Sequence, residues 1–175
     1  MDLTIVTFLP VVAAAIIMLL PQQQEQNAKY VALLFAVGGL LYSLFLFADF
    51  DVNGTGYQLV ENRKWVEIGQ FDLRYHLGVD GLSMPLVLLT TFLTVAAVLV
   101  SFSVNTRPRL YYSMLMLLST SVIGVFVSLD FMLFFLFWEL ELFPMFLLIA
   151  IWGSGRREYS ATKFVLYTIA GSAFM

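Results

Sequence analysis

The chain alternates between long apolar runs and short polar connections. Five runs are long enough to span a membrane, because a helix needs about 20 apolar residues to cross about 30 Å of hydrocarbon. They cover Leu3–Leu20, Tyr30–Ala48, Leu82–Val104, Tyr111–Ser128 and Phe131–Trp152. A sixth run, residues 160–175, is still apolar where the sequence stops and makes only about 24 Å of helix. The pattern predicts an all-α integral membrane protein, a single multi-helix transmembrane bundle whose last helix is incomplete, and we expect the chain to be the first part of a longer one.

The first apolar run has a second interpretation, a secretory signal peptide. Such a peptide begins with positive charges, whereas the only charged residue before this run is Asp2. We therefore expect an uncleaved first helix.

The longest connection, residues 49–81, follows a different pattern. After the turn-forming residues 53–56, apolar and polar positions alternate at Trp65–Ile68 and again at Phe71–Tyr75. Alternation with a period of two is typical of strands, and Gly69-Gln70 between the two runs suits a turn. We predict a short extramembrane hairpin between the second and third helices.

Basic residues in the loops predict how the bundle lies in the membrane. Short loops on the cytoplasmic side are enriched in lysine and arginine. One set of loops carries five basic residues and the other carries three: Lys29, Arg107, Arg109, Arg156 and Arg157 against Arg63, Lys64 and Arg74. We therefore expect the N-terminus on the outer side, together with the hairpin.

Composition supports a membrane protein and excludes several kinds of site. The 175 residues are 61% hydrophobic and 12% charged, against about 45–50% and about 25% in soluble domains. The sequence has no cysteine, which excludes iron–sulfur clusters held by this chain, and His76 is its one histidine. A net charge of −3 gives no reason to expect nucleic acid. We expect no metal or cofactor in this chain, and any redox centre would belong to a partner.

Two glutamates inside the fifth run are the clearest sign of function. An acidic residue near the centre of a membrane helix costs about 2.5–3.5 kcal/mol, so Glu139 and Glu141 together cost roughly 5–7 kcal/mol. The apolar residues of the run return a similar amount, but packing alone does not require the acids. Intramembrane carboxylates typically belong to a proton or ion pathway. The alternative is a structural role as buried hydrogen-bonding groups.

The two glutamates point in different directions. At 100° per residue they lie about 200° apart around the helix, so they cannot face the same cavity. Pro144 leaves the carbonyl of Leu140 without its helical donor, which predicts a kink beside Glu139. We expect one glutamate to serve an internal path and the other to face an interface or a second helix.

Lys163 is the candidate counterpart on the sixth helix. Ser160, Lys163, Tyr167 and Gly171 fall on one helical face and form a polar stripe. The lysine could join a proton path with a glutamate, or its ammonium group could extend to the membrane surface.

Two aspartates stand directly before predicted helices. Asp80 precedes the third helix and Asp130 the fifth. Aspartate is a favoured N-cap, so we predict helix caps at both positions rather than proton relays.

Motifs in the second half of the chain carry a resemblance to a known family. Trp138-Glu-Leu-Glu-Leu-Phe-Pro144, Trp152-Gly and Tyr159-Ser-Ala-Thr-Lys163-Phe-Val-Leu-Tyr167-Thr are similar to the antiporter-like chain M (subunit 4) of proton-pumping NADH:quinone oxidoreductase, respiratory complex I. The likeness is greatest to its photosynthetic, ferredoxin-using relatives. Gly78-Val-Asp80-Gly81-Leu-Ser83 matches the same family. The resemblance runs from about Leu77 to Met175 and weakly through the first two helices.

The resemblance implies a fourteen-helix protein with two inverted five-helix repeats, each containing a broken helix. In the family, the glutamate of the fifth helix, here Glu139, pairs with a lysine of the seventh helix, beyond this sequence. It implies other membrane subunits as partners, including sister antiporter-like subunits, in a bacterial plasma membrane or a thylakoid. NADH or ferredoxin, flavin, iron–sulfur clusters and quinone would be bound by partner subunits. Glu141 receives no definite role.

The function we expect is proton translocation as a subunit of NADH (or ferredoxin):quinone oxidoreductase. Electron transfer elsewhere in the complex would change the distance from Glu139 to its positive neighbour and thereby its proton affinity. Two alternatives remain open: a subunit of a stand-alone multi-subunit sodium/proton antiporter, and a structural membrane scaffold without ion transport. Flavin and iron–sulfur centres in the native assembly would distinguish the oxidoreductase subunit from the stand-alone antiporter.

Overall fold

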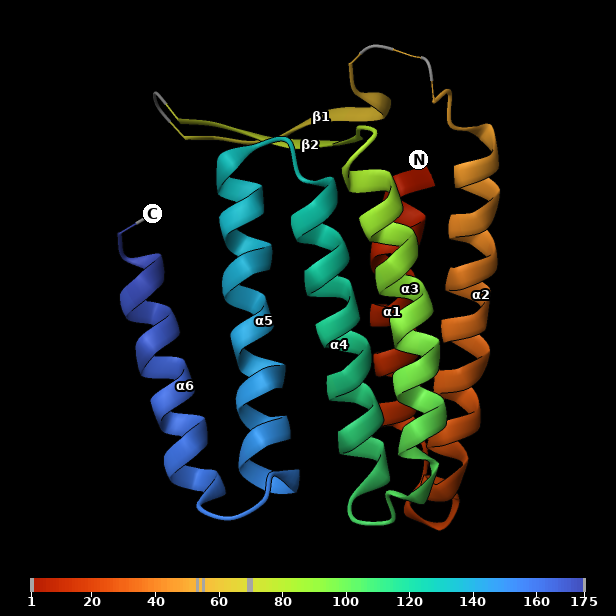
Figure 1. The fold of residues 1–175 in the computed structure, drawn as a ribbon, viewed down its shortest axis with the longest axis vertical. Coiled ribbons are helices and arrows are strands. Elements are labelled where there is room, and N and C mark those ends of the chain that lie inside the picture. Colours follow the sequence, from red (N-terminus) through yellow and green to blue (C-terminus); the bar gives the residue numbers. More distant parts are fainter. Residues whose placement is uncertain (1, 53, 55, 69–70, 175) are drawn as a thin grey trace.

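The computed structural model describes residues 2–52, 54, 56–68 and 71–174, in which six long helices lie side by side and a β-hairpin lies across one end (Figure 1). The helices are α1 (Asp2–Leu19), α2 (Ala28–Asp49), α3 (Ser83–Val100), α4 (Pro108–Val127), α5 (Phe131–Trp152) and α6 (Arg157–Ser172). Two short 3-10 turns, η1 (Gln22–Asn27) and η2 (Ser101–Ser103), precede α2 and follow α3. The predicted fold class, a helical membrane bundle with a hairpin between the second and third helices, is confirmed.

Several helices begin or end at other residues than the sequence predicts. Helix α4 begins at Pro108 and α6 at Arg157, before the expected starts at residues 111 and 160. Proline is well suited to the first turn, whose N–H groups lack helical partners, and a long basic side chain at a helix end can reach water. Helix α3 ends at Val100, and η2 replaces its expected continuation. Helix α5 has the expected bounds.

The hairpin consists of antiparallel strands β1 (Gln58–Ile68) and β2 (Phe71–Val79), and it is longer than expected. The expected turn at residues 69–70 lies outside the described residues. The inner end of β2 is part of the core, because Leu77 and Val79 are fully buried. The amide of Leu129, between α4 and α5, donates to the carbonyl of His76 at 2.9 Å. The hairpin is therefore attached to the bundle rather than suspended above it.

The helices form a bundle with an exposed flank. Helix α4 packs against α1, α3 and α5, and α2 packs against α1 and α3. Helix α6 packs mainly against α5 and stands at the edge of the bundle (Figure 1). The side of α5 and α6 farthest from α2 is thus the least covered part of the molecule.

Small and hydroxylated side chains hold the helices together. Alanines allow close approach in a membrane, where apolar surface alone gives helices little reason to associate. The buried alanines of α1 and α2 are Ala13, Ala14, Ala28, Ala32 and Ala36. Hydroxyl pairs join α2 to α3, with Ser43 Oγ 2.8 Å from Thr91 Oγ1, and α3 to α4, with Thr94 Oγ1 2.9 Å from Ser119 Oγ.

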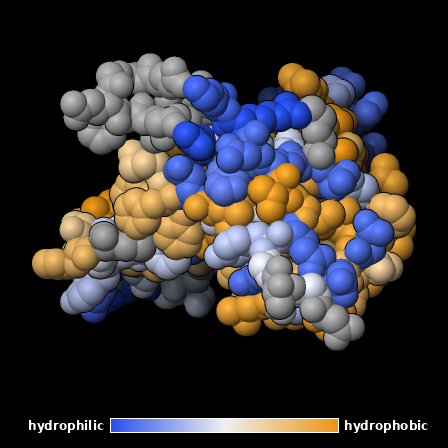
Figure 2. Space-filling view, turned by 90° about the horizontal axis from the view of Figure 1, so that it is seen from above, coloured by the Kyte–Doolittle hydropathy of each residue, from blue (hydrophilic) through white to orange (hydrophobic). Residues whose placement is uncertain are grey.

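The outer faces of the helices suit a hydrocarbon environment. Leu34 is 71% exposed and Phe45 is 66% exposed, both on α2. Seen from the hairpin end, hydrophilic residues gather over the middle of that face and hydrophobic residues stand around its rim (Figure 2). Five of the described helices are long and apolar enough to cross a membrane. The chain is a multi-pass membrane protein.

Candidate functional site

The aspartates before α3 and α5 hold helix ends. Asp130 Oδ1 accepts hydrogen bonds from the amides of Met132 at 3.0 Å and Leu133 at 3.1 Å. Asp80 Oδ1 accepts from the amides of Leu82 at 3.0 Å and Ser83 at 2.7 Å. The hydrogen bond from the Ser83 amide, above all, lowers the pKa of Asp80 below its ordinary value. The predicted capping role is confirmed for both residues.

The orientation of α5 is set by Phe137. This buried side chain packs on Gly124 of α4, where a Cβ atom would lie only 2.3 Å from the Phe137 ring. At 100° per residue, Glu141 lies about 40° around the helix from Phe137, whereas Glu139 lies about 200° away. Glu141 is therefore on the side of α5 that faces α4, and Glu139 is on the opposite side.

Glu139 shares its side of α5 with exposed apolar residues. Leu136 and Phe143, 50% and 56% exposed, lie about 40–60° from it around the helix. Glu139 and Glu141 are each half-buried, and neither makes a hydrogen bond or ion pair with any residue that the structure describes. The packing of Phe137 turns Glu139 away from α1–α4, so an internal path lined by Glu139 would need a helix other than these four.

Lys163 is not brought to either glutamate. The buried residues Ala161 and Ser172 mark the side of α6 that packs on α5, and Trp138 Nε1 of α5 donates to Ser172 Oγ at 3.1 Å. Lys163 lies about 200° around the helix from Ala161, so it points away from α5. It is exposed, and its Nζ lies over the rings of Tyr159 and Tyr167, 5.9 and 5.6 Å from their centroids.

The packing of α6 explains why Lys163 meets neither glutamate. The small residues form the contact with α5, since they allow the two backbones to approach. The stripe that contains Lys163 is consequently the outer face of the helix, and a direct Glu–Lys163 pair is absent from the described structure.

Pro144 does not interrupt the helix. Helix α5 continues from Phe131 to Trp152, with Pro144 buried inside it. The proline still removes the N–H that would have bonded the carbonyl of Leu140. The described part of α5 is a continuous helix with one missing backbone hydrogen bond near the glutamates.

A polar cluster that the sequence did not indicate joins α1 to the hairpin. Glu61 of β1 accepts hydrogen bonds from the amide of Thr4 at 3.1 Å and its hydroxyl at 2.6 Å, and Tyr75 Oη lies 2.8 Å from Thr4 Oγ1. Partial burial alone would raise the pKa of Glu61, but the hydrogen bonds from Thr4 help to bring it below its ordinary value. The partners are 57 residues apart, and no local pattern marks them.

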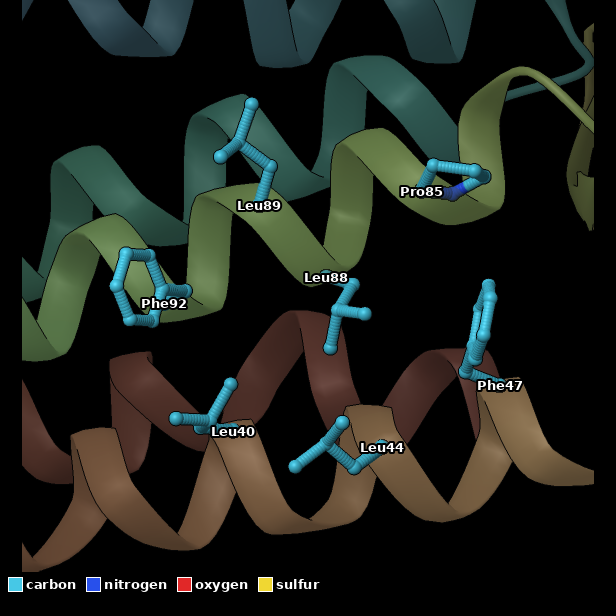
Figure 3. Close-up of a pocket in the computed structure, with 7 residues that line it drawn as sticks. All are labelled: Leu40, Leu44, Phe47, Pro85, Leu88, Leu89 and Phe92. Carbon is cyan, nitrogen blue, oxygen red and sulfur yellow. The ribbon is translucent and has the colours of Figure 1, made fainter.

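A wide apolar groove lies between α2 and α3, with side chains from both helices pointing into it (Figure 3). Its volume is about 460 Å³, and it is lined by Leu40, Leu44, Phe47, Pro85, Leu88, Leu89 and Phe92. None of these side chains can exchange a proton, so the groove is no part of a proton path. Within the described residues, no three histidine, aspartate or glutamate side chains gather in a way that could hold a metal ion.

Comparison with known proteins supports the resemblance seen in the motifs. The family described as "NADH:quinone oxidoreductase/Mrp antiporter, TM" matches residues 128–175, which contain α5 and α6. A chain 4-1 of the NAD(P)H-quinone oxidoreductase of Synechocystis sp. is 42% identical over 99% of this chain and 33% of its own length. Subunit M of the NADH-quinone oxidoreductase of Rhodobacter capsulatus is 45% identical over 99% of this chain and 34% of its own length.

A solved structure shares the fold. A chain in the structure of the membrane-bound sulfane sulfur reductase, an archaeal respiratory membrane complex, matches 99% of this chain and 26% of its own length with a TM-score of 0.78 and 19% identity. The chain spans about a third of the length of the curated relatives it matches. Over its whole length the chain corresponds to the N-terminal third of chain 4, or subunit M, of the quinone oxidoreductases. The chain belongs to this family, which is the one that its motifs resemble.

Proposed function

We propose that this chain is part of the proton-translocating membrane subunit of an NADH or ferredoxin:quinone oxidoreductase. The observation that carries the proposal is a half-buried glutamate, Glu139, well inside a membrane helix that lies within the matched family region. It lies about 12 Å along the helix from the start of α5 and about 20 Å from its end. A carboxylate at such a depth is costly and is typically retained for ion or proton movement.

In this proposal, the partner of Glu139 is a positive side chain on a helix outside the described residues. Two findings support this. Glu139 lies on the side of α5 opposite α4, and Lys163, a basic residue two turns into α6, points away from α5. A helix packed against this side would cover Leu136 and Phe143 and exclude lipid from the carboxylate. The resemblance assigns the partner role to a lysine of a seventh helix.

The proton step follows from electrostatics. A positive charge beside a carboxylate favours its ionised form, and withdrawal of that charge favours the protonated form. A change in the distance between Glu139 and the lysine would therefore load and release a proton. Electron transfer in partner subunits, which would bind NADH or ferredoxin, flavin, iron–sulfur clusters and quinone, would drive this change. Sister antiporter-like subunits would neighbour this chain in the membrane.

A second candidate is a subunit of a stand-alone sodium/proton antiporter, because the description of the matching family includes Mrp antiporters. The native assembly that contains the full-length protein, purified from its membrane, separates the two. We expect flavin absorbance, iron–sulfur electron paramagnetic resonance signals and quinone reduction to co-purify with it. An assembly without these centres that exchanges sodium for protons would overturn the proposal in favour of the antiporter.

A further inference from the structure

The end of the bundle opposite the hairpin contains a partly polar pocket. Its volume is about 260 Å³, and it is lined by Met18, Glu25, Arg107, Arg109 and Leu110. Met18 is near the end of α1 and Leu110 is near the start of α4, two helices long and apolar enough to cross a membrane. The pocket therefore lies where hydrocarbon gives way to water, on the side that the loop charges predict to be cytoplasmic.

Arg109 is held in place within this pocket. Its Nη1 donates to the carbonyl of Leu20 at 2.6 Å, and its Nε is 3.8 Å from Glu25 Oε2. A guanidinium carries five N–H donors in a planar fork. The two contacts fix its position and leave the Nη2 group for another acceptor.

Arg107 supplies a second positive charge. Its side chain is exposed and makes no ion pair with any residue that the structure describes. The loop before it is anchored, because Trp152 Nε1 donates to the carbonyl of Thr106 at 2.9 Å. The pocket thus combines one fixed guanidinium, one guanidinium without an ionic partner, one carboxylate and two apolar side chains.

We propose that this pocket binds the headgroup of an amine-bearing zwitterionic phospholipid, such as phosphatidylethanolamine. The phosphate would contact Arg107 and Arg109, because arginine forks match phosphate oxygens and basic pockets on the cytoplasmic side bind lipid headgroups. The ammonium group would contact Glu25. Met18 and Leu110 would contact the glycerol and the first acyl carbons. Two positive charges and one negative charge complement a headgroup with one phosphate and one amine, and the carboxylate disfavours a second negative charge. This inference does not depend on the proposed function.

The test uses the full-length protein in its purified native complex, reconstituted in phosphatidylcholine nanodiscs with added phosphatidylethanolamine or phosphatidylglycerol. Native mass spectrometry after detergent release counts the lipids retained. We expect the wild type to retain one more phosphatidylethanolamine per complex than Arg107→Gln. Arg156→Gln is the matched control, because it removes the same charge from another exposed arginine on the same side.

Glu25→Gln provides a second, independent variant. It keeps both arginines and removes the group proposed to bind the amine, so retention should shift from phosphatidylethanolamine to phosphatidylglycerol. Equal losses in Arg107→Gln and Arg156→Gln would show a general effect of surface charge and overturn the proposal. Displacement of the retained lipid by millimolar inorganic phosphate would identify a soluble-anion site instead. No shift in Glu25→Gln would refute the amine assignment.

Discussion

At the residue level, the contact between α4 and α5 depends on the absence of a side chain at position 124. A Cβ atom there would lie 2.3 Å from both Cγ and Cδ1 of Phe137, far inside normal contact distance. The Phe137 ring occupies the space that any larger residue would need. Because this contact fixes the rotation of α5, it also determines that Glu139 points away from α4.

We expect Gly124→Ala to destabilise the protein by about 1–3 kcal/mol, the usual cost of inserting a methyl group into a well-packed contact. Thermal unfolding of the full-length protein in detergent would measure this. Gly38→Ala is the control, because a Cβ atom at Gly38 of α2 would have no neighbour within 4 Å. Equal melting temperatures for the two variants would show that α4 and α5 are not packed as described.

At the element level, the hairpin is tied to α1 by an ionised carboxylate. The hydrogen bonds from Thr4 help to hold the folded pKa of Glu61 below the ordinary value of a glutamate. Such a group stabilises the folded state above the unfolded pKa, and the stabilisation is lost as the pH falls through the folded pKa. The attachment of the hairpin should therefore weaken in acid.

Glu61→Gln should lower the melting temperature of the full-length protein at pH 7, and its difference from the wild type should shrink as the pH falls below about 4. Melting curves from pH 7 to pH 3 would measure both effects. Glu158→Gln, at the other end of the bundle, serves as the control for a general change in charge. A difference that stays constant with pH would mean that the ionised form of Glu61 does not contribute.

The elements themselves could be predicted because membrane helices need long apolar runs, which the sequence displays directly. The rotation of each helix about its own axis could not be predicted in the same way. Helices α5 and α6 are apolar on several sides, so periodicity does not distinguish a packed face from a lipid-facing one. The sequence left two alternatives for the polar stripe with Lys163, a proton path or the membrane surface, and in the structure the small residues Ala161 and Ser172 form the contact with α5 instead. The positions of the small residues Ala161 and Ser172 were the available signal for the packed face of α6.

The hairpin, too, could be predicted only in part from the sequence. The alternation at residues 65–75 predicted its existence, but its strands extend to Gln58 and Val79. Its attachment through Thr4 and Glu61 joins segments far apart in the chain, and no local pattern could show it. Contacts of this kind depend on tertiary structure.

At the level of the whole molecule, the hairpin and the arginine-containing loops lie at opposite ends of the bundle (Figure 1). Single cysteines introduced at Val52 and at Arg156, in full-length protein without other accessible cysteines, should react with an impermeant maleimide from opposite sides of sealed vesicles. The cytoplasmic side should label position 156, because basic loops remain inside. Labelling of both positions from one side would contradict the arrangement of spans.

The whole molecule also places the candidate proton-carrying residue, which is half-buried, on a side of α5 that α1–α4 do not cover. Glu139 lies on the side of α5 opposite α4, at the flank where α6 forms the edge of the bundle. Glu141 lies toward α4, on the same side of α5 as Phe137, and makes no ion pair with any residue that the structure describes. The central claim is that Glu139, through a positive partner on another helix, carries the proton.

The most direct measurement is acidification of inverted vesicles that contain the assembled complex and are supplied with electron donor, compared between Glu139→Gln and Glu141→Gln. The amide keeps the shape of the side chain and removes its charge, so assembly should survive in both variants, and the amount of complex is checked in each. We expect Glu139→Gln nearly to abolish proton pumping and to lower coupled quinone reduction, while Glu141→Gln has a milder effect. Normal pumping by Glu139→Gln, or a greater loss in Glu141→Gln, would contradict the assignment of Glu139.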